Sequence, residues 1–181
     1  MDNRPTITIK LKPYLQEYLQ CKINEPLTNS SKNIIGVILT PFIERIPADY
    51  IPKIEKGPDF IEIDLVNFDR LDIRGNCYVS EDNQRNFSRI LDAHFKDVFY
   101  SYVDDKIRYE IVIDKKIRKI EIKKIILQFC ADYHITFNNI TYEMLKKSYY
   151  RHKIEQEENQ KKNKLFYRKT SLCCPLIFLS L

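Results

Sequence analysis

Cations gather at regular spacing in NITYEMLKKSYYRHK, residues 139–153, and give this segment the clearest potential for chemistry. If the segment is helical, its apolar residues share one side and the cations occupy the other. Lysine and arginine on such a face can bind phosphate oxygens, and tyrosine can donate to phosphates or stack on sugars. The candidate contacts are Lys146, Lys147, Tyr150, Arg151 and Lys153.

The distribution of charge places this segment in a basic half of the chain. The net charge is +5, but residues 1–105 carry 13 Lys and Arg against 17 Asp and Glu, whereas residues 106–181 carry 17 against 8. Such asymmetry indicates that the C-terminal part binds an anionic partner, nucleic acid first and a membrane surface second. The alternative is a lysine-rich helical face that serves only solubility.

A cluster of acidic residues is the second place where chemistry could occur, because carboxylates bind divalent metal ions. Its members are Asp59, Glu62, Asp64, Asp69 and Asp72. The stretch PDFIEID, residues 58–64, is similar to metal-dependent nucleases that place Pro-Asp before Glu-x-Lys, but Asp64 stands in place of the lysine and the spacing is too short. Since Glu62 and Asp64 alternate onto one strand face, we expect a solvated face and no metal site.

The cysteines and histidines offer no complete site. Cys130 and His134 are four residues apart and could share a metal ion, but two further ligands at matched spacing are absent. His94 falls in an apolar stripe, where we expect a histidine at the edge of a core. The five cysteines are odd in number and scattered, which favours a reducing, cytoplasmic compartment over a disulfide framework.

Glycine is scarce, and its scarcity limits the possible chemistry. There are three glycines and none after Gly75, which excludes the glycine-rich loops that hold nucleotide phosphates. We therefore predict a protein that is not an enzyme and that uses no cofactor and no small-molecule substrate. The N-terminal residues alternate and predict no secretory signal, and the apolar tail is shorter than the ~20 residues of a spanning helix, so we expect no membrane partner.

Apolar periodicity predicts an α+β fold, with an N-terminal strand-helix-helix region, a small antiparallel sheet and a helical C-terminal region. Alternation predicts strands, and spacings of three or four predict helices. Residues 106–114 alternate without a preceding breaker, and we expect a strand or connector there. The expected strands are 6–11, 59–68 and 71–79, the last two paired across a turn near Asp69 and Arg70; the loop is 47–58; the expected helices are 13–23, 30–46 with capping serines and a bend near Pro41, 80–102, 121–135, and one from about residue 141.

Residues 120–153 have the order of a helix-turn-helix: a packed helix, the polar turn TFNN and a second helix with a basic outer face. FCADYHIT followed by NITYEMLKKSYYRHK resembles the helix-turn-helix end of small DNA-binding proteins of phages and integrative mobile elements. The resemblance implies a regulator or accessory factor that binds double-stranded DNA with the second helix in the major groove. The alternative is a plain helical hairpin in a non-enzymatic structural or protein-interaction component of such an element.

The N-terminus offers a second DNA-binding arrangement. A strand followed by two helices is the order of a ribbon-helix-helix, in which two chains pair their strands and Thr6, Thr8 and Lys10 would face the groove. An edge strand on an α+β domain competes with it, and a homodimer is left open. The expected domains are an acidic α+β domain, 1–105, a basic helix-turn-helix-like region, 106–160, and a poorly ordered tail, 161–181.

Overall fold

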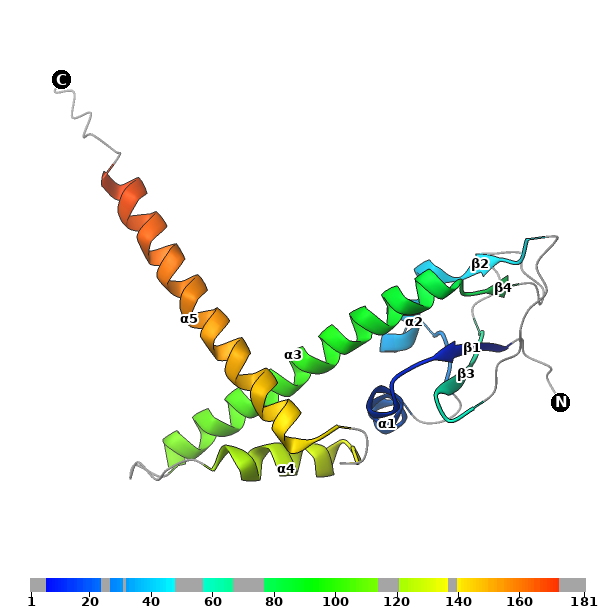
Figure 1. The fold of residues 1–181 in the computed structure, drawn as a ribbon, viewed down its shortest axis with the longest axis horizontal. Helices are drawn as coiled ribbons and strands as arrows, with labels where there is room; N and C mark the ends of the chain where they lie inside the picture. Colours follow the sequence, from blue (N-terminus) through cyan, green and yellow to red (C-terminus); the bar gives the residue numbers. More distant parts are fainter. Residues whose placement is uncertain are drawn as a thin grey trace, which may run out of the picture. The chain divides into compact units, whose positions relative to one another are not determined.

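A computed structural model of the chain comprises two compact units, Met1–Thr141 and Tyr142–Leu181 (Figure 1). It describes residues 6–23, 27–30, 32–47, 57–66, 77–113, 121–136 and 140–172. Helices and two small antiparallel sheets make up these residues, which confirms the predicted α+β class. In chain order the elements are β1 (Thr6–Lys10), α1 (Pro13–Lys22), α2 (Ile34–Leu39), the 3-10 helix η1 (Thr40–Phe42), β2 (Glu44–Arg45), β3 (Phe60–Asp64), β4 (Cys77–Tyr78), α3 (Glu81–Ile113), α4 (Ile122–Asp132) and α5 (Tyr142–Leu172).

The pairing of the strands differs from the predicted hairpin. β3 pairs with β1, and Ile7 lies opposite Ile63 while Ile9 lies opposite Ile61. All four isoleucines are buried on one face of the sheet, so this register joins two matched apolar rows. β4, which was expected beside β3, pairs instead with β2, and its two residues are only half-buried. The hairpin prediction was therefore wrong, because burial of the isoleucines favours the distant strand over the near one.

α3 carries the core of the first unit, and α1 packs beside it (Figure 1). The rings of Tyr14 and Tyr18 on α1 each lie 5.3 Å from the ring of Phe95. Proline is tolerated in the first turn of a helix, which is where Pro13 stands, as the sequence predicted. The buried residues of α3 recur every four positions, a narrower stripe than the predicted one: Phe87, Leu91, Phe95, Phe99 and Val103.

The prediction of a strand or connector at 106–114 was wrong up to Ile113, where α3 ends. No glycine or proline interrupts this segment, and each residue added to an existing helix gains a hydrogen bond without a new nucleation cost. Alternating side chains alone do not make a strand, because a strand needs a partner to bond its backbone. The predicted domain boundary at residue 105 falls inside this helix.

α2 is shorter than the predicted helix 30–46. Its N-cap is Asn33, whose side-chain oxygen accepts a hydrogen bond from the Gly36 amide at 2.8 Å, so the predicted capping serines do not cap it. Pro41 lies in η1, where the helix tightens and ends, as expected from proline. Gly36 packs so closely on the chain before α2 that an added Cβ would stand 1.9 Å from the carbonyl oxygen of Ser30.

α4 packs its aromatic side chains on α3 and ends abruptly. The Phe129 ring lies 5.0 Å from that of Phe99. Beyond the helix, His134 adopts a left-handed conformation with φ of 54°, and Ile135 donates its amide to the Cys130 carbonyl oxygen at 2.8 Å. This is a Schellman motif, which satisfies the last carbonyls of a helix and is usually completed by glycine or asparagine. A chain without glycine after Gly75 uses histidine there.

Some predicted features lie outside the described residues, and the structure does not bear on them. They are residues 48–56 of the predicted loop, the turn near Asp69 and Arg70, residues 137–139 of the predicted turn, and residues 173–181 of the tail.

Candidate nucleic-acid interface on α5

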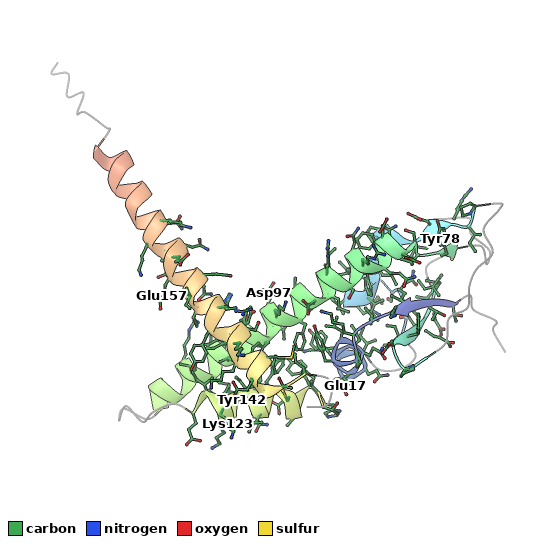
Figure 2. The ribbon with its side chains drawn as sticks, in the orientation of Figure 1. Glu17, Tyr78, Asp97, Lys123, Tyr142 and Glu157 are labelled. Atoms are coloured by element: carbon green, nitrogen blue, oxygen red, sulfur yellow. The ribbon has the colours of Figure 1, made fainter. Side chains whose placement is uncertain are left out.

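α5 is a single helix of 31 residues, about 46 Å long at 1.5 Å per residue. Leu145 and Tyr149 are buried and mark its inner side. Met144, which was expected on the same apolar side as Leu145, is 57% exposed, because one residue step turns the helix by about 100°. Figure 2 places Tyr142 in the first turn and Glu157 farther along the helix.

Two of the predicted contacts, Lys146 and Lys153, are half-buried and engaged with neighbours on α5 itself. The Nζ of Lys146 lies 3.9 Å from Oε1 of Glu143 and 5.6 Å from the centroid of the Tyr142 ring. The Nζ of Lys153 lies 3.3 Å from Oε1 of Gln156, and also over the ring of Tyr149. Both cations are therefore already partly satisfied and are less available to a partner.

The other predicted contacts, Lys147, Tyr150 and Arg151, are exposed together on the outer side. Lys147 and Arg151 are four residues apart, which places them one turn apart on the same face. Neither makes an ion pair or hydrogen bond with another residue in the described part of the chain. Tyr150 is 45% exposed, and its ring lies 6.2 Å from that of the buried Tyr149. The structure thus brings together three of the five predicted residues.

Sequence reasoning missed the continuation of this face along the helix. Lys161 and Lys162 are exposed and, like Lys147 and Arg151, have no ion-pair partner within the described ranges. The sequence analysis treated the far half of the helix as a segment charged on all sides. Counting at about 100° per residue would have shown that several residues lie within about 50° of one direction, opposite Leu145 and Tyr149. These residues, named here the outer stripe, are Lys147, Arg151, Ile154, Glu158, Lys161 and Lys162.

The connection between α4 and α5 is longer than the expected turn. α4 ends at Asp132 and α5 begins at Tyr142, so nine residues separate them. The turn of a helix-turn-helix has three or four residues. The Schellman motif at His134 also ends α4 before the predicted TFNN turn begins. The argument for an interface therefore rests on α5 by itself.

The other candidate sites stay without support. Asp59 and Glu62 are exposed, Asp64 is half-buried, and Asp69 and Asp72 lie outside the described residues. The described ranges contain no group of three or more possible metal ligands. Cys130 is buried, whereas His134 lies exposed beyond the helix end, so the pair does not share one helix face.

The two remaining sequence candidates lie in the first unit. His94 is half-buried, with its ring 6.1 Å from the Tyr18 ring, which confirms its expected place at the edge of the core. Thr6 and Lys10 are exposed and Thr8 is half-buried, but β1 already pairs with β3 of the same chain along one edge. A ribbon made with a second chain would have to use the other edge.

Comparison with known proteins gives no guide to function. No family model matches the chain, and neither a curated protein nor a solved structure matches it. Within the described residues, no helix combines the length and the apolar character needed to cross a bilayer. The function is therefore argued from the residues of the outer stripe.

Proposed function

We propose that this protein binds double-stranded DNA through the outer stripe of α5, as a regulator or accessory factor without catalytic activity. The observation that carries the proposal is the pair Lys147 and Arg151, exposed one turn apart and without an ion-pair partner among the described residues. Cations left without an internal partner can neutralise phosphates and release the counterions that surround DNA.

The dimensions of α5 suit the major groove of DNA. A helix with its side chains is about 10–12 Å across, and the groove is about 12 Å wide. In this arrangement Lys147 and Arg151 bind phosphates along one wall of the groove. Tyr150 stands beside them and donates its hydroxyl to a phosphate oxygen. The major groove of duplex RNA is too narrow for side chains to enter, which favours DNA as the partner.

An anionic membrane surface suits this helix less well. A helix that lies in a membrane interface has a broad apolar face opposite its cations. On α5 the exposed apolar residues Met144 and Ile154 stand among charges, and Glu158 lies in the same stripe. A carboxylate in this position would be repelled by anionic headgroups and would lose its hydration on insertion.

The experiment is a titration of a fluorescently labelled duplex with the full-length chain, read by anisotropy at several salt concentrations. The double substitution Lys147→Ala and Arg151→Ala should weaken binding and reduce the magnitude of the log–log salt slope by about 1.8, at ~0.9 for each lost phosphate contact. The matched control is Arg85→Ala with Arg89→Ala on α3, which removes the same charge at the same spacing from two exposed positions. The control should leave the slope unchanged.

Three outcomes would overturn the proposal. The first is absence of duplex binding at low salt, and the second is an equal loss in the α5 and α3 double variants. The third is a preference for duplex RNA, or for vesicles of phosphatidylserine and phosphatidylcholine, over duplex DNA.

A further inference from the structure

Charge along α5 falls into three blocks, basic at each end and acidic in the middle. Residues 142–153 hold four Lys and Arg against one Glu, residues 154–160 hold three Glu and no cation, and residues 161–172 hold five Lys and Arg and no acid. The outer stripe follows this order. Lys147 and Arg151 form one basic pair, Lys161 and Lys162 form the other, and Ile154 with Glu158 lies between them.

The spacing of these groups matches the width of a groove. Arg151 and Lys161 are ten residues apart, which is about 15 Å along the helix axis. This exceeds the roughly 12 Å between the walls of the major groove by about the amount needed for cations to reach the phosphates from outside. A helix that crosses the groove obliquely can therefore bind the phosphates of one strand with its first basic pair and those of the other strand with its second.

The middle of the stripe is then placed over the base pairs. Ile154 is 57% exposed, so the fold does not bury most of this apolar side chain, and the floor of a groove would cover it. Glu158 is exposed and has no ion-pair partner among the described residues, although cations follow it on the next turn. A carboxylate is repelled by phosphates but can accept a hydrogen bond from the cytosine amino group in the major groove.

We infer that Ile154 and Glu158 read the DNA sequence, Ile154 by contact with a thymine methyl group and Glu158 by accepting from cytosine N4. The inference rests on the proposed function and assigns to it a sequence preference. Ile154 and Glu158 are four residues apart, about 6 Å along the axis, and base pairs stack about 3.4 Å apart. The preferred thymine and cytosine therefore lie about two base pairs from each other.

The test begins with selection of bound duplexes from a random-sequence library by the full-length chain. The parent should enrich a thymine and a cytosine at this separation. Glu158→Gln should move the preference at the second position from cytosine toward adenine, since glutamine pairs with adenine, by about 5- to 150-fold in relative affinity. Glu157→Gln is the matched control: it removes the same charge from the adjacent exposed residue, about 100° around the helix (Figure 2), and should leave the preference unchanged.

Uracil in place of thymine tests the contact of Ile154, because the two bases differ only by the methyl group. The parent should bind the uracil duplex more weakly than the thymine duplex, and Ile154→Ala should bind the two equally. Duplex binding without sequence preference, or identical preferences in Glu158→Gln and Glu157→Gln, would overturn the inference while leaving the proposed function intact. Absence of any duplex binding by the parent would overturn both.

Discussion

A carboxylate at Asp92 fastens α1 to α3, and its removal should destabilise the first unit. The Tyr14 hydroxyl donates to one oxygen of Asp92, and the Nζ of Lys96 lies 2.7 Å from the other. The Asp92 side chain is 17% exposed, and Tyr14 is buried. Burial and the hydrogen bond to Asp92 raise the pKa of Tyr14, so the phenol keeps its proton and stays a donor.

We expect Asp92→Ala to lower the free energy of unfolding by about 2–3 kcal/mol. A hydrogen bond to a charged group contributes about 1.5–3 kcal/mol, and a buried hydroxyl left without a partner costs about 1–3 kcal/mol. The contact with Lys96 adds little, because the lysine side chain is 45% exposed and returns to water. Asp92→Asn keeps an acceptor for Tyr14 and should cost about 1 kcal/mol, the lower end of this range. Urea denaturation at neutral pH measures both.

The effect should depend on pH in a defined direction. Burial alone would raise the pKa of Asp92, but the hydrogen bonds from Lys96 and Tyr14 outweigh it and hold the pKa below the ordinary value of 3.8. The folded state therefore favours the ionised carboxylate, and its contribution is present above pH 3.8 and lost as pH falls through the lower folded pKa. The stability gap between the parent and Asp92→Asn should narrow in that acidic range.

Asp97→Asn provides the control, because Asp97 is exposed on the same helix (Figure 2). Equal stabilities of Asp92→Asn and Asp97→Asn at neutral pH would refute the reasoning. A stability gap that stays constant on acidification would refute the assigned direction of the pKa.

Two further predictions concern the backbone. His134→Gly should raise the free energy of unfolding by about 1 kcal/mol, since glycine adopts the left-handed conformation without the Cβ penalty; a lower urea midpoint in this variant would contradict the Schellman motif at the end of α4. Gly36→Ala should lower stability by at least the ~1–3 kcal/mol of an overpacked core, because the new Cβ would collide with the backbone of Ser30, and an unchanged melting temperature would contradict that packing.

Local patterns in the sequence predicted much of the fold. β1 and α1 were predicted closely, because Ile7 and Ile9 alternate and Pro13 opens a helix. The partner of β3 was not predicted, since pairing between distant strands depends on which apolar faces match in space. The length of α3 was missed because alternation at 106–114 was weighed above the absence of a breaker.

The candidate site was predicted only in part, and for a geometric reason. Sequence position placed Lys146 and Lys153 with Lys147 and Arg151, but helix rotation turns the first two toward Tyr142 and Tyr149. The same rotation brings Lys161, Lys162, Ile154 and Glu158 onto one face with Lys147 and Arg151. Rotation could have been counted from the sequence once the helix was known to continue to Leu172, and that continuation was the missing information.

The salt dependence of duplex DNA binding tests the central claim most directly. The parent chain is compared with a variant in which Lys147, Arg151, Lys161 and Lys162 are all alanine, between about 50 and about 200 mM salt. With ~0.9 for each phosphate contact, the four cations should account for about 3.6 of the log–log slope, and the variant should lose that amount. A parent that does not bind, or a variant whose slope equals that of the parent, would contradict DNA binding through the outer stripe of α5.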